Sequence, residues 1–556
     1  MRTVVYATEA GLHPKAGVEC SEKLQAFLNS NPENATLVLA PGDYYLEHRV
    51  SIEGLRNVQI LGHGVRFVCH FDMCDPYAYP GCFKVKDCRD LSLCGFTLTN
   101  DNPVNTTGRV VSIDRENYVV DILLDEGFTL TGNERIFGVD SFDEDAAGPN
   151  WHVFFSDDGN GKGKGYRYKR IGQRMIRMFC WPSTGVQVLD LTPGERLCLR
   201  HGLYPTDQIT FRDCYRVELT DVTVESSPGE SCSIYERCAD FTFRRFRVAL
   251  PRGCGRLYSS NTDGIHVVGL GGRLLIEDCD FENLGDDAVN VHTTGAVIAS
   301  VEGTIVHCTL GDRLGVKGGL LSDRWAQSGD EIAVYEKDTF VKKGSFRVVE
   351  YTVNRLSVTD VNCELCPGDM LANMAFCPEV IMRNCRVKGT RARGVLFQTH
   401  RVLLENSYFS QISNQAVQIT SDMERWAEMC PCEEVVIRGC VFESNGLTHK
   451  PVRAGGIAIG VGHGGHCYDI AHKDGVHGSV TIDGNRFVHL KDPAIFADGV
   501  QRISVTNNEF VSCCAGSEER YPDYAFGTVL FNCKQRRYAG NSWIGQPDKA
   551  YLEKNA

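Results

Sequence analysis

The chain has 556 residues, of which 42% are hydrophobic, and its formal net charge is −13 at pH 7. This length is sufficient for a large buried core and suggests several domains. The acidic balance argues against a nucleic-acid partner, because phosphate binding needs a clustered basic surface. No stretch is apolar over the length needed to span a bilayer, so no membrane partner is expected either.

The N-terminus and the cysteines bear on localisation. The first residues lack the apolar segment of a secretory signal, and 25 cysteines are spread over the whole chain. Unless a leader has been removed, these features favour a cytoplasmic protein with reduced, buried thiols over a disulfide framework. No cysteine pairs recur at zinc-finger spacing, and His266 and His292 lack a third convergent ligand, so no metal is expected. No cofactor is expected either.

The first predicted elements are a short amphipathic helix over residues 21–28 and a strand, turn and strand over residues 37–46. In a protein built from stacked strands, such a helix would cover the open end of the stack. Uncovered strand edges invite pairing with other chains. We therefore expect the helix to cap the N-terminal end.

A repeat of about 23 residues organises most of the chain. Its core is the pattern Cys-x-x-apolar-x-apolar, which begins at Cys88, Cys214, Cys238, Cys377 and Cys432. One coil cannot bury its apolar face alone, so neighbouring coils stack. The leucine and asparagine consensus of leucine-rich repeats is absent. The sequence predicts an all-β fold, a right-handed parallel β-helix.

Two stretches interrupt the repeat and read as short strands with turns, which predicts two inserted small β-barrels. They could wall the site, form a dimer contact or be purely structural. The predicted division is a cap with first coils (1–105), a first barrel (106–203), coils with an acidic site (204–298), a second barrel (299–373) and C-terminal coils (374–556).

Three aspartates form the most informative motif. Asp263 lies in Asn-Thr-Asp-Gly, and Asp286 with Asp287 in Gly-Asp-Asp-Ala. The 24 residues between Asp263 and Asp287 equal one repeat, which would place these carboxylates on neighbouring strands about 4.8 Å apart. Like charges at that separation drive pKa values apart, as acid–base hydrolysis requires. The motif indicates a glycoside hydrolase.

A polar ladder extends from these aspartates. Aligning coils on a small residue followed by Ile or Val puts Asp263, Asp287, Arg393 and Gln415 in one column. Three positions on, the alignment gives a second column, in which Tyr235 stands one coil before His266. Such side chains suit hydrogen bonding to sugar hydroxyls, although polar ladders also stabilise solenoid turns. The candidate substrate-binding residues are His266, Asn290, Arg391, Arg393, Gln398, Gln415, Gln418, Tyr235 and Trp426. Trp426 could stack on a sugar or pack internally.

The segments Asn261-Thr-Asp-Gly-Ile-His266 and Gly285-Asp-Asp-Ala-Val-Asn290 resemble those of glycoside hydrolase family 110. The resemblance covers essentially the whole chain. It implies a bacterial, inverting α-1,3-galactosidase that removes terminal galactose from glycans such as the blood group B antigen. It further implies that Asp286 is the general acid and that Asp263 and Asp287 activate the attacking water. A homodimer is compatible with the sequence.

Two alternatives stay open. Polygalacturonase-like family 28 enzymes share the Asn-Thr-Asp and Asp-Asp motifs, but their Arg-Ile-Lys phrase is missing here. Arg391 and Arg393 could still meet a uronate carboxylate. A non-catalytic, carbohydrate-binding solenoid would use the same polar ladder for binding alone.

Overall fold

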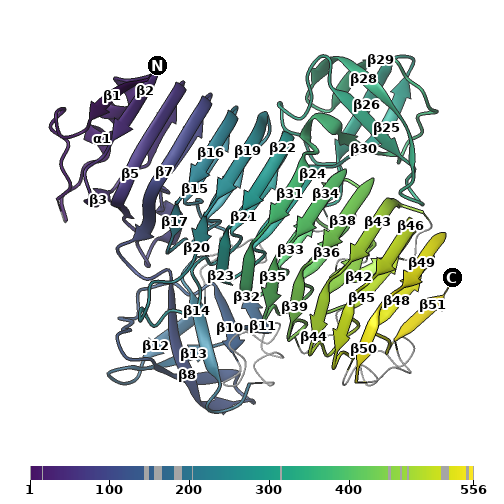
Figure 1. Cartoon of the computed structure of the whole chain (residues 1–556). Coiled ribbons are helices and arrows are strands. Elements are labelled where there is room, and N and C mark those ends of the chain that lie inside the picture. The colour runs from purple at the N-terminus through teal and green to yellow at the C-terminus, as the bar shows by residue number, and fades with distance from the viewer. Residues whose placement is uncertain are drawn as a thin grey trace.

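The protein is an elongated parallel β-helix with the chain termini at opposite ends (Figure 1). The computed structural model describes residues 2–554 except 16, 143–148, 156–165, 181–190, 203, 314–315, 449–452, 464–465, 472–474, 515–524 and 546–549. No helix among the described residues is long and apolar enough to cross a membrane. The predicted fold class is confirmed.

Three stacks of parallel strands form the solenoid. The first contains β7 (Arg89–Asn100), β16 (Tyr215–Thr220), β19 (Cys238–Arg244), β22 (Leu270–Glu277), β31 (Glu379–Arg383), β34 (Arg401–Glu405), β38 (Glu434–Arg438), β43 (His477–Asp483), β46 (Val500–Thr506) and β49 (Gln535–Ala539). The second contains β17 (Thr223–Val224), β20 (Arg247–Val248), β23 (Asp280–Leu284), β32 (Arg386–Thr390), β35 (Tyr408–Ser410), β39 (Val441–Glu443), β44 (Arg486–Val488), β47 (Glu509–Val511) and β50 (Ser542–Ile544).

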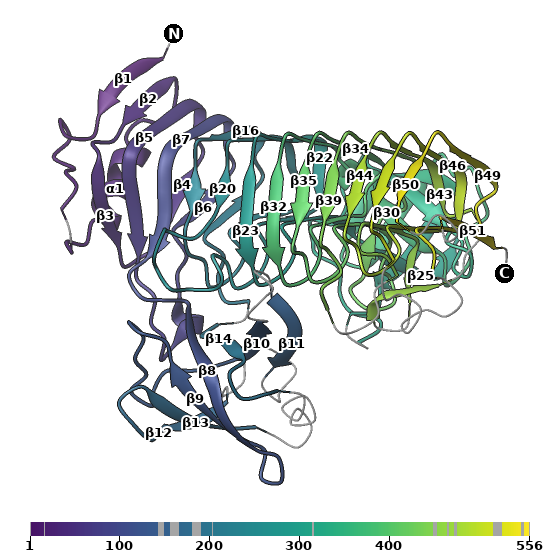
Figure 2. The same ribbon diagram turned by 60° about the horizontal axis from the view of Figure 1, so that its bottom comes forward.

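The third stack carries the polar ladder. Its strands are β4 (Val50–Glu53), β6 (Phe83–Lys86), β15 (Ile209–Arg212), β18 (Cys232–Ile234), β21 (Ile265–Val268), β24 (Val289–Thr294), β33 (Val395–Phe397), β36 (Val417–Ile419), β40 (Ile457–Ile459), β45 (Ile495–Asp498), β48 (Thr528–Phe531) and β51 (Tyr551–Lys554). Figure 2 shows successive coils side by side along the solenoid axis.

The N-terminal end is capped as the sequence predicts. Helix α1 (Ser21–Asn29) buries Leu24, Phe27 and Leu28 and contacts β4. The strands that complete this end are β1 (Thr3–Tyr6), β2 (Ala35–Val38), β3 (Gly42–Leu46) and β5 (Arg56–Cys69).

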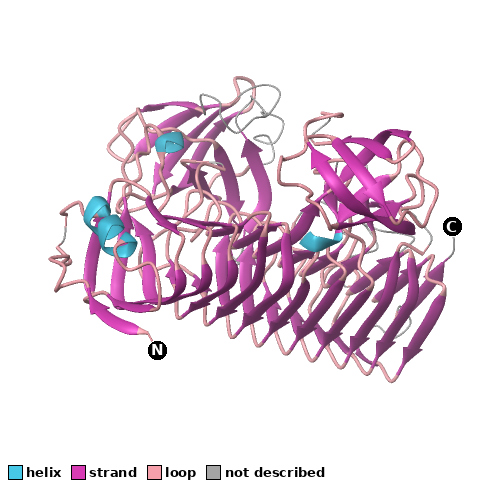
Figure 3. Cartoon of the chain, turned by 90° about the horizontal axis from the view of Figure 1, so that it is seen from above, coloured by secondary structure: helices cyan, strands magenta, loops and turns pink. Residues whose placement is uncertain are grey.

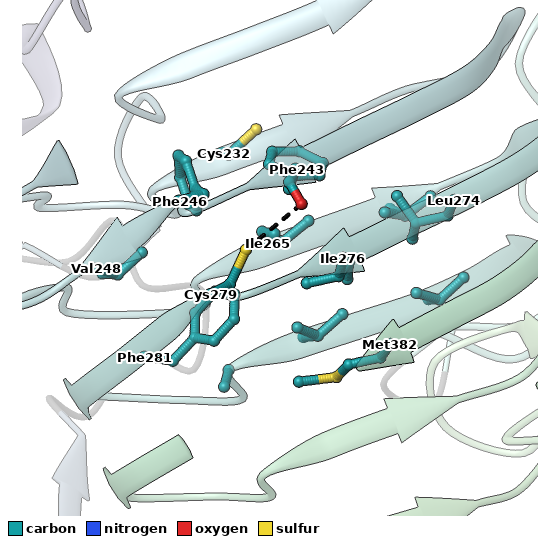
Figure 4. Close-up of a cluster of buried hydrophobic side chains, with 14 of the residues drawn as sticks. Cys232, Phe243, Phe246, Val248, Ile265, Leu274, Ile276, Cys279, Phe281 and Met382 are labelled. Carbon is teal, nitrogen blue, oxygen red and sulfur yellow. Dashed lines mark hydrogen bonds between the residues drawn. The ribbon is translucent and has the colours of Figure 1, made fainter. Parts of the chain in front are cut away.

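The core lies inside the coils, where small thiols and large aromatic rings fill the space between the stacks. Cys279 is buried, and its thiol donates a hydrogen bond to the carbonyl of Phe243 at 3.5 Å (Figure 4). Cys69 and Cys82 form a disulfide, whereas the other cysteines whose side chains the structure describes are not disulfide-bonded. The expectation of reduced thiols therefore has one exception.

Both insertions stand on the same side of the solenoid (Figure 3). The second is a closed barrel of β25 (Ala296–Glu302), β26 (Ile305–Leu310), β27 (Glu331–Tyr335), β28 (Lys342–Thr352), β29 (Arg355–Thr359) and β30 (Met370–Asn373). The described strands of the first form an antiparallel sheet of β8 (Asn105–Asp114), β9 (Val119–Leu124), β10 (Gly138–Phe142), β11 (Pro149–Phe155), β12 (Arg167–Arg170), β13 (Met175–Phe179) and β14 (Arg196–Arg200).

Candidate active site

The three aspartates lie at the starts of two neighbouring strands of the third stack. Ile265 of β21 is paired with Val289 of β24, so Asp263 and Asp287 occupy equivalent positions on adjacent coils. A Cβ atom on the intervening Gly264 would come within 2.5 Å of the Ala288 carbonyl oxygen, so this turn needs glycine. One carboxylate oxygen from each of Asp263, Asp286 and Asp287 lies within 4.8 Å of the others.

Asp263 and Asp287 are held by hydrogen bonds to both of their carboxylate oxygens. Asp263 accepts from the backbone N–H of Asp287 at 3.0 Å and lies 2.8 Å from Nδ1 of His266. Asp287 accepts from the backbone N–H of Arg393 and from its guanidinium, both at 2.7 Å. Both aspartates are buried, so their orientations are fixed by the surrounding coils.

Asp286 has a different environment. Its Oδ2 accepts a hydrogen bond from the Tyr204 hydroxyl at 2.8 Å and another from the Arg391 guanidinium at 2.7 Å. Its Oδ1 accepts none from the described residues. The Asp286 side chain is 14% exposed, against 6% for Asp263 and 2% for Asp287. Asp286 is thus the carboxyl group of the three that is most accessible to a bound molecule.

The environments drive the carboxyl pKa values apart. Burial raises the pKa of Asp287 to about 8 against the charge of Arg393, with help from Asp286 and Asp263. Burial also raises the pKa of Asp263, although His266 opposes it. Burial acts on Asp286 too, but Arg391, Arg393 and the Tyr204 hydroxyl hold its pKa below the ordinary value. These divergent values are what a site with separate acid and base groups requires.

Histidines connect the aspartates to a further carboxylate. Nε2 of His266 lies 3.1 Å from Nε2 of His292, and His292 lies 3.5 Å from Glu428. Burial lowers the pKa of His266, but the hydrogen bond and charge of Asp263 dominate and raise it to about 9. His266 is therefore protonated at neutral pH, and its positive charge faces Asp263.

Arg200, at the end of β14, ties the first insertion to the acidic turns. Its side chain is 1% exposed and pairs with Asp140 of β10 at 2.8 Å. Its guanidinium also donates to the carbonyl oxygens of Asn261 and Gly285, at 2.8 and 3.4 Å. These two residues open the motifs that carry the aspartates, so Arg200 positions both turns.

The aspartates open into a cavity of about 1170 Å³ on the outer face of the third stack. Of the residues singled out in the sequence, those that line this cavity are Asp263, Asp286, Asp287, His266, Asn290, Arg391, Arg393, Gln398, Gln418, Tyr235 and Trp426. Gln415 follows Arg393 in the predicted column, but it is fully buried and does not reach the cavity.

Tyr235 lies in a different column from the one expected. Ser233, not Tyr235, pairs with His266. Tyr235 lies two positions further on, in line with Val268. The position equivalent to Asp263 on this coil is therefore Glu230. This coil has Ser231-Cys232 where the other coils have a small residue followed by Ile or Val. The sequence alignment of the coils was therefore out of register here.

Several lining residues were missed in the sequence. Glu230 could have been identified from the coil spacing, because it occupies the position equivalent to Asp263. Tyr204 and Asp422 lie in connections between the coil strands, and Glu428 lies in the short strand β37 (Glu428–Met429) outside the repeat, so no periodicity marks any of them. Asp207 accepts a hydrogen bond from the Tyr235 hydroxyl at 3.1 Å. Its sequence position before β15 carries no motif.

The acidic cluster is compact enough to hold a cation, but its carboxylate oxygens are already occupied by hydrogen-bond donors. Both carboxylate oxygens of Asp263 and Asp287 already face hydrogen-bond donors. Arg391 additionally occupies Oδ2 of Asp286. Hard cations need oxygens that are free to coordinate and do not tolerate adjacent guanidinium groups. The donor set suits carboxylates that act on a substrate directly.

The fold and site define a β-helical protein with an acid–base cluster in a cavity. Alpha-1,3-galactosidase B of Akkermansia muciniphila is 27% identical over 482 residues, which are 83% of this chain and 57% of that protein. This chain thus spans little more than half of that relative. Alpha-1,3-galactosidase B of Bacteroides thetaiotaomicron is 23% identical over 98% of this chain and 91% of its own.

No family model matches the chain. Among solved structures, a family 28 exopolygalacturonase of Yersinia enterocolitica aligns with 9% identity and a TM-score of 0.47, covering 100% of this chain and 78% of its own. An exopolygalacturonase of Thermotoga maritima aligns with 11% identity and a TM-score of 0.41, covering 98% and 92%.

Proposed function

We propose that the protein is an inverting exo-α-1,3-galactosidase of the family 110 type, which removes terminal α-1,3-linked galactose from glycans such as the blood group B antigen. The observation that carries this proposal is the cluster of Asp263, Asp286 and Asp287, whose environments differ within one cavity. The similarity to proteins named alpha-1,3-galactosidase over 98% of the chain supports the substrate.

Asp286 is the proposed general acid. It is the most exposed of the three carboxyl groups, and its Oδ1 has no hydrogen bond to the described residues. That oxygen can deliver a proton to the glycosidic oxygen as the bond to the anomeric carbon breaks. The cluster titrates as a unit and shares one proton at neutral pH, since burial raises the pKa of Asp287 to about 8. In the reactive form this shared proton lies on Asp286, and Asp263 and Asp287 are ionised.

Asp263 and Asp287 are the proposed base pair. A water held between them attacks the anomeric carbon from the face opposite the leaving group and loses a proton to a carboxylate. The protonated His266 and the Arg393 guanidinium stabilise the negative charges of these groups before the transfer. The products are galactose with an inverted anomeric centre and the shortened glycan.

One end of the cavity is walled, which suits removal of a terminal sugar. The segment 421–429 folds over the third stack, where β37 (Glu428–Met429) pairs antiparallel with the end of β24. Trp426 in this segment forms a backbone bridge with Arg313 of the second insertion. A glycan can therefore enter with only its terminal residue at this end.

The carboxylate separation does not by itself favour inversion. Inverting pairs are typically about 6.5–9.5 Å apart and retaining pairs about 5 Å. The oxygens of this cluster approach within 4.8 Å. What supports inversion is that both oxygens of Asp263 and of Asp287 already accept hydrogen bonds, which makes each a poor nucleophile and a suitable partner for water.

The polygalacturonase-like alternative has less support. It would need Arg391 and Arg393 to receive a uronate carboxylate, but these guanidinium groups are bound to Asp286 and Asp287.

The activity is tested with two neutral substrates, the branched blood group B trisaccharide and linear galactosyl-α-1,3-galactose, and with polygalacturonate as the competing substrate. We expect release of galactose from at least one galactoside and no cleavage of polygalacturonate. Turnover of polygalacturonate alone would overturn the proposal, and binding without turnover would favour the carbohydrate-binding solenoid.

The proposal predicts an alkaline limit to activity. Because burial raises the pKa of Asp287 to about 8, the cluster holds a proton at neutral pH and loses it as the pH rises. We expect kcat/KM to fall by about tenfold per pH unit above pH 8. The same raised pKa lowers the stabilising contribution of Asp287 as the pH rises from about 4 to about 8.

The measurement is a kcat/KM profile from pH 5 to 10 on linear galactobiose, with the folded fraction followed by circular dichroism at each pH. A kcat/KM that stays constant to pH 10 in folded enzyme would contradict the shared proton.

A further inference from the structure

The cavity continues from the aspartates toward the N-terminal coils, where its lining changes from acidic to basic. In the outward column that contains Val268 of β21, the preceding strands present Tyr235, Arg212 and Lys86 in turn. Lys84 of β6 stands in the adjacent column, in register with Thr210. These side chains face outward from the solenoid. The cavity is lined here by Lys84, Lys86, Arg212 and Tyr235.

The three cations Lys84, Lys86 and Arg212 are here called the basic groove. Glu53 of β4 stands opposite Lys86, and the charge of Arg212 lowers the pKa of the Glu236 carboxyl against the effect of burial. No described acidic side chain lies within ion-pair distance of any of them. The guanidinium of Arg212 instead lies over the ring of Tyr235, with its carbon 4.6 Å from the ring centroid. This contact holds the side chain against the floor of the cavity.

Other charged groups nearby are already engaged. Arg324 of the second insertion pairs with Asp213, and Arg49 donates to the Thr210 hydroxyl at 2.8 Å. Asp207 accepts from Tyr235, while Glu230 is buried beside Asp207 and its pKa is raised well above the ordinary value by burial and by that neighbour. The charge of Asp207 acts on Arg49, and neither Asp207 nor Glu230 forms an ion pair with a cation of the basic groove.

Two cations of the basic groove face each other across neighbouring strands. Lys86 and Arg212 are directly opposite each other on neighbouring strands, and like charges in that position destabilise a sheet. Glu53 of β4 faces Lys86 from the other side but forms no ion pair with it among the described residues. In a chain with a net charge of −13, three cations without an ion pair to the described residues at one end of a cavity are not a general property of the surface. An anionic group bound between them would remove the repulsion.

We propose that the basic groove binds an anionic substituent of the glycan, a sulfate ester or a carboxylate, on the leaving-group side of the scissile bond. This inference rests on the proposed function. The walled end of the cavity takes the terminal galactose, so the rest of the glycan extends over β18, β15 and β6. Two or three strand spacings separate the cations from Asp263, which corresponds to about 10–14 Å. The anionic group is therefore on the second or third sugar, not on the galactose that is released.

The test compares three trisaccharides that share a terminal α-1,3-linked galactose. One is neutral, one carries a 6-sulfate on the third sugar, and one has a uronic acid as the third sugar. At low ionic strength we expect kcat/KM to be about tenfold higher for an anionic form than for the neutral one, mainly through a lower KM. The preference should shrink as salt is added. The sulfate and the uronate distinguish the two sources of negative charge.

Two variants locate the effect. Lys84→Gln combined with Lys86→Gln, and Arg212→Gln alone, should each lower the ratio of anionic to neutral kcat/KM toward one. The matched control is Arg502→Gln on β46, outside the cavity, which should keep the wild-type ratio. Equal kcat/KM for all three trisaccharides in the wild type, with the neutral one cleaved, would overturn the basic groove and leave the proposed function intact.

A binding measurement tests the basic groove if the proposed hydrolase activity is absent. If no trisaccharide is cleaved, calorimetric titration of the wild type with the sulfated and neutral forms is decisive. Tighter binding of the sulfated form that the Lys84→Gln and Lys86→Gln pair abolishes would support the basic groove and overturn the hydrolase. Equal or absent binding of both forms would overturn both.

Discussion

Replacing Asp286 with Asn is expected to lower kcat/KM on linear galactobiose by about 10²–10⁴-fold, the range of general acid catalysis. The amide keeps the shape of the carboxyl group and an oxygen that can accept from Tyr204 and Arg391. It cannot deliver a proton to the leaving oxygen. Substrate binding should persist, so the loss should appear in kcat rather than in the dissociation constant measured by calorimetry.

The leaving group reports on the role of Asp286. A galactoside with a nitrophenyl leaving group needs little protonation, so Asp286→Asn should lose far less activity on it than on galactobiose. Asp263→Asn and Asp287→Asn should lose activity on both substrates, because water activation is needed for each. The matched control is Asp43→Asn, in β3 and outside the cavity. Equal losses of Asp286→Asn on the two substrates would contradict its assignment as the acid.

Replacing Arg200 with Leu is expected to lower the free energy of unfolding by about 3–5 kcal/mol, because it leaves the Asp140 carboxylate buried without its partner. The same change removes the donor to the carbonyl oxygens of Asn261 and Gly285. The acidic turns should then shift, and activity should fall as well. Urea denaturation measures the first effect and galactobiose hydrolysis the second.

A double variant separates charge from positioning. Arg200→Leu with Asp140→Leu removes both buried charges, so much of the stability should return, as is typical when apolar residues replace a buried pair. Activity should not return, since the two carbonyl oxygens still lack their donor. Arg216→Leu is the matched control, because Arg216 and Asp90 form an exposed pair. Arg200→Leu with the stability of this control would contradict the account.

Much of the fold could be predicted because each coil of the solenoid repeats the same pattern of buried residues in the sequence. The cysteines and alternating apolar residues recur once per coil, and the structure buries them between the stacks. The same spacing predicts Asp263 and Asp287 on adjacent coils, and the register of β21 with β24 confirms it. The helix over residues 21–28 could be predicted from its apolar face, and α1 buries that face against the first coil.

The remainder of the site depends on contacts that no period encodes. Tyr204 reaches Asp286 from the connection after the first insertion, and Glu428 reaches His292 from a segment that folds back over the stack. The basic groove is similarly hidden, since Lys86 and Arg212 are neighbours in the sheet although the whole first insertion separates them in the chain. Tyr235 was misplaced where a coil departs from the common phrase.

The configuration of the released galactose tests the central claim most directly. Hydrolysis of linear galactosyl-α-1,3-galactose is followed by proton NMR from the first minutes, before the free sugar mutarotates. The account predicts that β-galactose appears first, because Asp263 and Asp287 direct water to the face opposite the leaving group. Initial release of α-galactose would show retention through a covalent intermediate, and would contradict the assignment of these two aspartates as the base.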